Sequence, residues 1–127
     1  MEHYESLFKA TRLRLPHISI KALTPVEIKH LSQLSNITFK ETLQRLKTAG
    51  LGSLPGGGAE ILDDEVRAVI CNGKESSSEY LEIHRSAHEL QIPTNCTMLF
   101  GTIETLEQQL MHMIQLRELN DETQGFQ

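Results

Sequence analysis

The sequence is poor in cysteine, in long apolar runs and in clustered basic residues. Its two cysteines, Cys71 and Cys96, form no CxxC pair and have no His-rich spacing beside them, so a disulfide framework and a closed metal site are not expected. No apolar run approaches the roughly 18 residues that span a bilayer. Residues 1–5 lack the basic start and apolar middle of a signal peptide, so we expect a cytoplasmic protein with no membrane partner.

Basic charge is scarce as well. The formal net charge is -5, the pI is about 5.6, and Lys and Arg gather on no single segment. A nucleic-acid surface needs a basic patch, so we expect no DNA or RNA partner. Hydrophobic residues make up 39% of the 127 positions, an ordinary content for a globular protein. We expect residues 1–127 to form a single segment of one domain.

Glycine, in contrast, is concentrated in one loop. Pro55 is followed by Gly56, Gly57 and Gly58, and the loop closes with the carboxylate of Glu60. Adjacent glycines cost backbone entropy and offer no side chain for packing. They permit positive φ angles and let backbone N–H groups approach a bound molecule, so we predict a ligand-binding loop. A tight turn that merely needs glycine is the alternative, because a glycine loop without a full fingerprint is weak evidence.

Capping-box spacing marks three helix starts, at residues 24–27, 38–41 and 76–79. In each box the hydroxyl of the first residue accepts a hydrogen bond from an unpaired backbone N–H of the helix, and the glutamate three residues later accepts one from the N–H of the first residue. The first two helices are predicted to end near Asn36 and at Gly50, which suit a left-handed helix cap. A further helix-like stretch starts near Asp63. The opening residues 2–13 fit an amphipathic helix with these residues facing inward: Tyr4, Leu7, Phe8 and Leu13.

Three short strands are predicted between the helices, over residues 17–23, 51–54 and 92–100. Strands separated by helical stretches of crossover length are typical of parallel βαβ units. Three strands cannot close a barrel, and residues 125–127 look like the start of another strand. We therefore predict an α/β fold, an interior part of a larger parallel (βα) barrel.

Ligands of parallel barrels bind at the carboxyl ends of the strands, so the residues after each strand are the first site candidates. Thr24 and Glu27 follow the first strand, the glycine loop follows the second, and Gly101 and Glu104 follow the third. The capping box alone already explains Thr24 and Glu27. The glutamate of the glycine loop has no such local explanation.

The third strand is polar for a buried parallel strand, since it carries Thr94, Asn95 and Thr97. Asn95 and Thr97 are two positions apart and share one face, which would line the lumen of a barrel. An edge strand that faces water is the alternative.

Other reactive side chains have plain interpretations. His84 and His88 are four apart on one helix and could bind a metal, but no third ligand is near in sequence, so we predict surface or packing residues. Arg85 is predicted to be a solvated helix residue. Cys71 and Cys96 lack a nearby base, and neither is a candidate nucleophile.

Six groups of residues along the chain carry a resemblance to a known family: Ser53–Ile61; Asp64–Arg67 with Ile70–Cys71 and Lys74; His84–Arg85 with Ala87–His88; Thr94–Asn95 with Thr97–Met98; Gly101 with Ile103–Glu104; and Leu116–Leu119 with Asp121–Thr123. Together they resemble the radical S-adenosylmethionine (SAM) enzymes of the futalosine route to menaquinone. The triple glycine favours this group over the deazaflavin-cofactor synthases. Asn95 with residues 125–127 favours aminofutalosine synthases over dehypoxanthine futalosine cyclases.

The resemblance implies a TIM-like partial barrel of the radical SAM type, in which this chain supplies about three central βα units of a six-unit barrel. It also implies SAM and a 4Fe-4S cluster as cofactors of the full-length enzymes. Their CxxxCxxC motif is absent from this sequence, and Cys71 and Cys96 cannot reproduce it. We therefore expect no metal ligand in this chain, whose cluster-binding part and C-terminal strands would be missing.

The resemblance also implies site residues, although no catalytic residue is assigned. Glu60 resembles the acid that contacts the ribose or amino group of SAM, and Lys74 resembles the basic residue that meets its carboxylate. Residues 97–104 resemble a degenerate form of the GxIxGxxE stretch that lies near adenine in the superfamily. They keep its later glycine, Gly101, and its glutamate, Glu104. The implied cofactor-binding set is Gly56, Gly57, Gly58, Glu60, Lys74, Thr97, Leu99 and Gly101. The implied substrate-binding set is Lys21, Thr24 and Asn95.

The implied parent activity adds a 5′-deoxyadenosyl radical to the vinyl carbon of 3-[(1-carboxyvinyl)oxy]benzoate, an enolpyruvyl benzoate, in menaquinone biosynthesis. Rearrangement and loss of carbon dioxide then give aminofutalosine. Without the cluster motif we expect the chain alone to be inactive. One alternative is a non-catalytic fragment that self-associates through open sheet edges. Another is a phosphate-binding α/β domain, against which the carboxylate of Glu60 counts.

Overall fold

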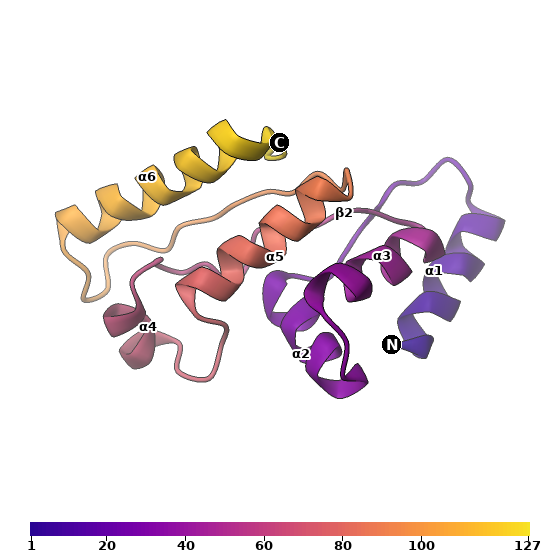
Figure 1. Ribbon diagram of the computed structural model, residues 1–127, viewed down its shortest axis with the longest axis horizontal. Coiled ribbons are helices and arrows are strands. Elements are labelled where there is room, and N and C mark those ends of the chain that lie inside the picture. Colours follow the sequence, from indigo (N-terminus) through magenta and orange to yellow (C-terminus); the bar gives the residue numbers. More distant parts are fainter.

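Six helices and two short strands make up the structure, a computed structural model that describes all residues from 1 to 127 (Figure 1). Their order is α1 (Glu2–Arg14), β1 (Ile20–Lys21), α2 (Pro25–Ser35), α3 (Phe39–Ala49), β2 (Leu51–Ser53), α4 (Asp64–Ile70), α5 (Ser77–Glu89) and α6 (Leu106–Thr123). No helix combines the length with the apolar character that crossing a bilayer requires.

The extended segments pair side by side in one parallel arrangement. β1 pairs with β2, with Ile20 opposite Leu51. Just beyond β2, Leu54 bridges in parallel to Thr94, which bridges in parallel to Phe126. The intervening helices bring the chain back to the same end each time, as parallel pairing demands. The glycine loop therefore follows the carboxyl end of the second segment.

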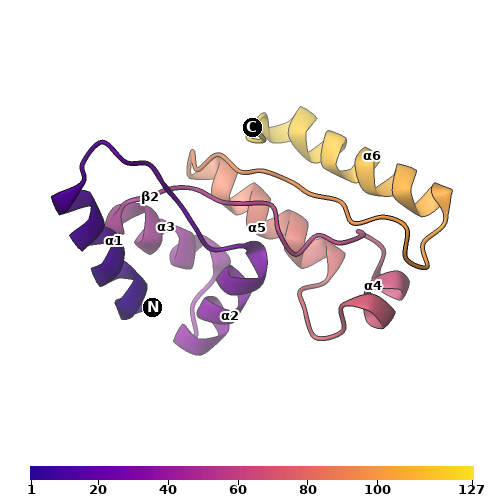
Figure 2. The ribbon, with the colours of Figure 1, turned by 180° about the vertical axis from the view of Figure 1, so that it is seen from behind.

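The helices pack along these segments, which cross in front of α3 and α5 in Figure 2. α3 contacts α1, α2 and α5, and α6 contacts α5. Between helices and strands lies the main core, whose buried members are Phe8, Leu23, Ile28, Leu31, Leu43, Leu46, Ala49, Leu51, Leu54, Ile83, Ala87 and Ile92. A smaller cluster beneath the glycine loop contains Ala59, Leu62 and Tyr80.

The three predicted capping boxes are all present. Thr24, Thr38 and Ser76 cap α2, α3 and α5, and in each case the glutamate three residues later reaches back. α2 ends at Asn36 with a φ of 51°, and α3 ends at Gly50 with a φ of 120°, both as predicted. The remaining helix starts use Asp63 for α4 and Thr105 for α6.

The strands are shorter than predicted. The strand predicted over residues 17–23 is reduced to β1, because a turn occupies Pro16 and His17 and because Leu23 takes a left-handed φ of 64°. The strand predicted over 51–54 is present as β2 with its bridge at Leu54.

The third predicted strand, over residues 92–100, is wrong apart from the bridge at Thr94. Beyond Asn95 this segment lies against the glycine loop. It makes single hydrogen bonds to the loop, from Thr97 and from Leu99, and no continuous ladder of backbone hydrogen bonds. The end of the chain behaves as predicted, since Phe126 pairs with Thr94 and the N–H of Gln127 donates to the Thr94 carbonyl at 2.9 Å.

The opening helix is present as α1, but two of its four predicted inward residues are wrong. Phe8 is buried and Tyr4 packs against the core, whereas Leu7 and Leu13 are 50% and 85% exposed. α1 has α3 as its main neighbour. A single neighbour covers only a narrow stripe of a helix, so the rest of the apolar face stays in solvent.

Candidate functional site

Two of the three loop glycines are required by the packing of the chain on itself. A Cβ placed on Gly56 would lie 2.5 Å from a backbone oxygen of the segment after α5, and one on Gly58 would lie 2.9 Å from a carboxyl oxygen of Glu75. Gly58 also has a φ of 101°. Gly57 has more room, since the nearest atom to its Cβ position is the Thr24 methyl carbon at 3.2 Å. The tight-turn interpretation thus accounts for Gly56 and Gly58.

The carbonyl groups of the loop are held by other parts of the protein. The Gly56 carbonyl accepts from the hydroxyl of Tyr80 at 2.8 Å and from that of Thr97 at 2.7 Å. The Glu60 carbonyl accepts from the N–H of Leu99 at 2.9 Å. The structure therefore brings Thr97 and Leu99, two of the predicted cofactor residues, against the predicted loop.

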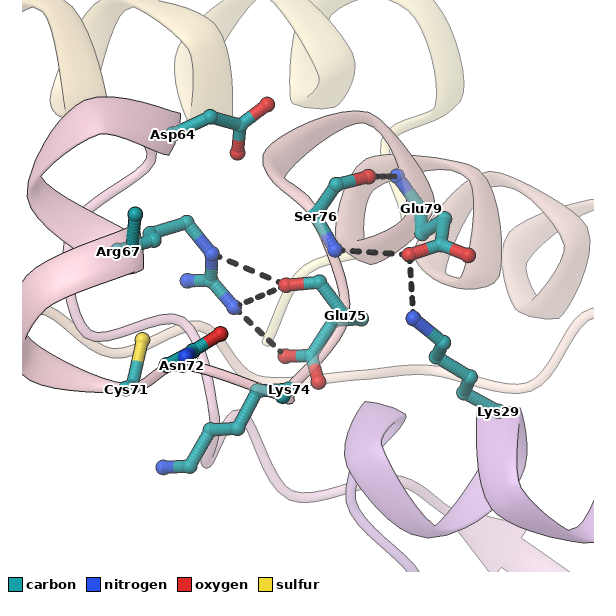
Figure 3. A pocket seen from close by; sticks show the side chains of 11 residues that line it. Lys29, Asp64, Arg67, Cys71, Asn72, Lys74, Glu75, Ser76 and Glu79 are labelled. Atoms are coloured by element: carbon teal, nitrogen blue, oxygen red, sulfur yellow. Dashed lines mark hydrogen bonds and ion pairs between the residues drawn. The ribbon is translucent and has the colours of Figure 1, made fainter.

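A buried arginine holds three more of these carbonyls. Arg67 from α4 is 4% exposed, and its guanidinium donates to the carbonyl oxygens of Gly58 at 3.3 Å, of Ala59, and of Ile61 at 3.2 Å. It also donates to the carbonyl and the carboxyl group of Glu75, at 2.5 and 3.3 Å (Figure 3). One side chain thereby fixes both the loop and the start of α5.

The N–H groups of the same loop have no such partners. None of those from Gly56 to Ile61 has an acceptor within the protein, whereas the next one, of Leu62, donates to the Nδ1 of His112 at 3.0 Å. Ala59 and Ile61 are fully buried, and buried backbone donors are almost always paired. Gly57, Gly58 and Glu60 are partly exposed, so their N–H groups without acceptors are suited to the oxygen atoms of a ligand.

Glu75 is a fully buried acid whose Oε2 has no hydrogen-bond partner. Burial raises the pKa of Glu75, against the opposing effects of Arg67 and Lys74. Beside it lies a cavity of about 350 Å³ (Figure 3). The charged side chains that line the cavity are Lys29, Asp64, Arg67, Lys74, Glu75 and Glu79.

Most of the charged groups in this cavity already have partners. Lys29 pairs with Glu79 at 2.7 Å. Asp64 accepts from the N–H and the hydroxyl of Ser77, each at 2.8 Å, and these bonds lower its pKa. Apart from the Oε2 of Glu75, the cavity is therefore a junction of paired polar groups between α2, α4 and α5.

Glu60 and Lys74, predicted separately, form an ion pair with 2.7 Å between Oε1 and Nζ. Both side chains are partly exposed, and Glu60 has a left-handed φ of 46°. Such a backbone conformation is uncommon for a residue other than glycine and is often found at functional sites. The pair places one acceptor and one donor beside the glycine loop.

Gly101 is not joined to this cluster by any hydrogen bond. It begins a turn of its own, with a φ of 90°, in which its N–H donates to Glu104 at 2.5 Å and the Thr102 hydroxyl donates at 2.6 Å. The Thr102 hydroxyl and then the Gly101 N–H hold the pKa of Glu104 at about 2. The glutamate of the predicted adenine stretch is thus engaged within its own turn.

The predicted substrate residues lie at the same end of the extended segments. The ammonium group of Lys21 donates to the Oδ1 of Asn95, whose Nδ2 donates to the carbonyl of Gln127 at 3.2 Å. Thr24 has the capping role of the alternative interpretation, since its N–H and hydroxyl donate to Glu27 at 2.6 and 2.8 Å. Lys21 and Asn95 are brought together, whereas Thr24 is joined to neither by a hydrogen bond.

His84 and His88 are packing residues, one of the two interpretations given for them. The Thr94 hydroxyl lies 2.7 Å from the Nδ1 of His84 and 2.8 Å from the Nε2 of His88, and the ring of Phe126 packs on both. Burial lowers the pKa of His84 to about 3 and also lowers that of His88. No three His, Cys, Asp or Glu side chains are grouped so that they could hold a metal ion.

Sequence reasoning missed several residues of the site. Arg85 is not merely solvated, as predicted, because it donates two bonds of 3.0 Å to Glu122 and so ties α5 to α6. Arg67, Glu75 and Tyr80 were not singled out as site residues at all. The only available signal was position, since Arg67 follows the loop by one helical turn and Glu75 directly precedes a capping box.

Comparison with known proteins gives consistent matches over the whole chain. The Radical SAM superfamily matches residues 2–116. Aminodeoxyfutalosine synthase of Thermus thermophilus is 51% identical over 124 residues, which are 98% of this chain and 33% of that protein.

Two similar archaeal proteins bear a different name, 5-amino-6-(D-ribitylamino)uracil–L-tyrosine 4-hydroxyphenyl transferase. The one from Methanothermobacter thermautotrophicus is 44% identical over 123 residues, which are 97% of this chain and 34% of that protein. The one from Methanosarcina mazei is 39% identical over 125 residues, with 98% and 33% covered. The chain thus spans about a third of the length of these relatives.

Proposed function

Because the chain belongs to the Radical SAM superfamily, we propose that it forms part of the SAM site of a radical enzyme. It would supply about three central βα units of a six-unit barrel, with the cofactor at the carboxyl ends of its extended segments. One observation carries the proposal: the glycine loop, the Glu60–Lys74 pair, the Thr97 hydroxyl and the Leu99 N–H meet at the carboxyl ends of the parallel segments.

The residues at this edge fit the polar groups of SAM. The N–H groups of the partly exposed residues Gly57, Gly58 and Glu60 can donate to ribose or carboxylate oxygens. The carboxylate of Glu60 can accept from ribose hydroxyls or from the amino group, and Lys74 can pair with the carboxylate of the methionine end. Bound SAM would supply the 5′-deoxyadenosyl group that radical chemistry of this kind uses. The residues of this chain bind and orient the cofactor and exclude water.

The residues of this chain do not fit a 4Fe-4S cluster. Cys71 and Cys96 are both free and belong to different parts of the fold, and no group of three ligating side chains is present. The proposal therefore assigns cluster ligation to residues outside these 127 and routes no step through Cys71 or Cys96.

For the substrate, we propose an enolpyruvyl benzoate, as in an aminofutalosine synthase. The 51% identity to the Thermus thermophilus enzyme supports this choice. The ammonium group of Lys21 and the amide of Asn95 are hydrogen-bonding groups that suit a carboxylate, and they are held together at the same edge as the loop.

A second candidate is favoured by the archaeal relatives at 44% and 39% identity. The name of these relatives specifies L-tyrosine and 5-amino-6-(D-ribitylamino)uracil as reactants. In that case the same SAM site would serve a different radical transfer, and Lys21 with Asn95 would meet the carboxylate of tyrosine.

A chimera tests the proposal and separates the two candidates. This chain replaces the matching third of the Thermus thermophilus synthase, and the reconstituted enzyme receives SAM with either substrate set. We expect aminofutalosine from the enolpyruvyl benzoate. A tyrosine-dependent product instead would support the second candidate, and a folded, cluster-loaded chimera with neither activity would contradict the proposal.

Glu60 provides the matched variant within that chimera. Glu60→Gln keeps the size of the side chain but removes its charge, so we expect SAM to bind about tenfold more weakly. The control is Glu107→Gln, the same change at an exposed position in the first turn of α6. Equal SAM affinities of the two variants would remove Glu60 from the site.

A further inference from the structure

The backbone of the glycine loop uses its two kinds of hydrogen-bonding group unequally. The carbonyls of Gly56, Gly58, Ala59, Glu60 and Ile61 all accept hydrogen bonds from the protein. The N–H groups from Gly56 to Ile61 donate none to it. A tight turn closes at most one hydrogen bond across itself, so five satisfied carbonyls need donors from other parts of the protein. The imbalance needs a cause outside the loop.

Arg67 is that cause for three of the five carbonyls. Its guanidinium is planar, carries five N–H donors in a fixed fork and cannot accept a hydrogen bond. It therefore selects oxygen atoms, and it holds those of Gly58, Ala59 and Ile61. A backbone whose carbonyls are fixed in this way keeps its N–H groups free for another molecule.

The position of Arg67 is itself fixed. Glu75 accepts from it through both a backbone and a carboxyl oxygen, and the side chains of the two residues are 5% and 0% exposed (Figure 3). Buried charge of this kind is costly to desolvate, and exchange for apolar residues is often neutral or stabilising. Stability alone is thus a weak reason for a buried arginine here.

We propose that Arg67 is a positioning residue, which holds the glycine loop so that the N–H groups of its partly exposed residues, Gly57, Gly58 and Glu60, face oxygen atoms of the bound ligand. The ligand group at the loop is then an acceptor, such as a ribose or carboxylate oxygen. The identification of that ligand as SAM rests on the proposed function, whereas the role of Arg67 in ordering the loop does not.

The test uses Arg67→Lys in the 127-residue chain. Lysine keeps the positive charge beside Glu75 but has a single ammonium group, which cannot reach several carbonyls in a planar fork. NMR order parameters of the Gly57–Ala59 amides report the loop. We expect values of about 0.85 in the wild type and below about 0.6 in the variant. We also expect the dissociation constant of SAM to rise by about tenfold or more.

A control is needed to separate the loss of loop order from a general loss of stability. Leu46→Ala, in the main core and away from the loop, is the control, because core truncation lowers stability without touching the loop. We expect its loop order parameters to stay at about 0.85 and its SAM affinity to stay within about twofold of the wild type. If Arg67→Lys does not fold, Arg67→Gln, which has no charge and one amide donor group, replaces it.

Three results decide the matter. A folded Arg67 variant with a wild-type loop and wild-type affinity would overturn the proposal. So would a Leu46→Ala protein whose loop loosens equally. If the wild-type chain binds no SAM while the Arg67 variant loosens the loop, the role of Arg67 stands and the proposed function fails.

Discussion

At the scale of single residues, Gly58 shows how the loop depends on the lack of a side chain. Its φ is 101°, and a Cβ would lie 2.7 Å from Val26 and 2.9 Å from Glu75. The left-handed conformation costs an L-residue about 1–2 kcal/mol, and overpacking costs about 1–3 kcal/mol. Gly58→Ala should therefore lower the free energy of unfolding by about 2–5 kcal/mol in urea denaturation.

Gly73 separates the two contributions. Its φ is 90°, but a Cβ there would meet no atom within 4 Å. Gly73→Ala should consequently lose only the conformational part, about 1–2 kcal/mol. Equal losses at Gly58 and Gly73 would show that contact with Val26 and Glu75 contributes nothing.

The loop itself was predictable from its glycines, but its support was not. Consecutive glycines are a local sequence pattern that indicates an unusual backbone conformation. Arg67 and Glu75 are separated by eight positions, and the burial of their charges follows from how α4 lies against the segment that precedes α5. An arginine in a helix is usually solvated, so no local pattern marks the exception.

At the scale of elements, helix α5 holds the segment that follows it through the hydroxyl of Thr94, which two residues of α5 share. The Thr94 hydroxyl bonds to His84 and to His88, and the Nδ1 of His88 also lies 2.6 Å from the Thr123 hydroxyl at the end of α6. α5, α6 and the third extended segment are thereby joined at buried neutral imidazoles. Protonation of these rings would disturb the packing.

This arrangement predicts a stability that declines in mild acid. Burial, and then the charge of His88, lowers the pKa of His84 to about 3. In the unfolded chain the imidazole of His84 binds a proton at the ordinary pKa of about 6.5. In the folded protein it remains neutral until the pH is much lower. The stabilisation is complete above about pH 6.5 and is lost as the pH falls toward 3, by about 1.4 kcal/mol per pH unit. Urea unfolding between about pH 7 and pH 5 measures this slope.

His84→Phe removes one titrating group, so the free energy of unfolding should depend less steeply on pH between about pH 7 and pH 5. The exposed His17 serves as the control, because His17→Gln should leave this dependence unchanged. A wild-type slope in the His84→Phe protein would contradict the assignment.

Helices were predicted better than strands, for a physical reason. A capping box is a local pattern, so the boxes at Thr24, Thr38 and Ser76 determine α2, α3 and α5 without further information. A strand exists only where a neighbour pairs with it. Residues 95–100 have strand-like composition, but beside them lies the glycine loop and not a strand.

At the scale of the whole molecule, the chain presents a parallel arrangement with free outer edges. β1 has a strand on one side only, and so does the bridge at Phe126. Free edges invite pairing with further strands or with a second copy. In the proposed enzyme, neighbouring barrel units would cover them.

We expect the isolated chain to form no 5′-deoxyadenosine from SAM under reducing, iron-replete conditions, because its two cysteines cannot supply three cluster ligands. Chromatographic detection of 5′-deoxyadenosine is the measurement. Its formation above a protein-free control would show that cluster ligation had been assigned wrongly.

The central claim is that the glycine loop receives SAM, and amide chemical shifts test it most directly. SAM and inorganic phosphate are titrated separately into the 127-residue chain. We predict saturable shifts for the amides of residues 56–61 and for Lys74 with SAM, and none with phosphate, because SAM offers Glu60 ribose hydroxyls and an amino group whereas phosphate offers it mainly negative charge. Shifts with phosphate alone, or no response to SAM, would contradict the claim.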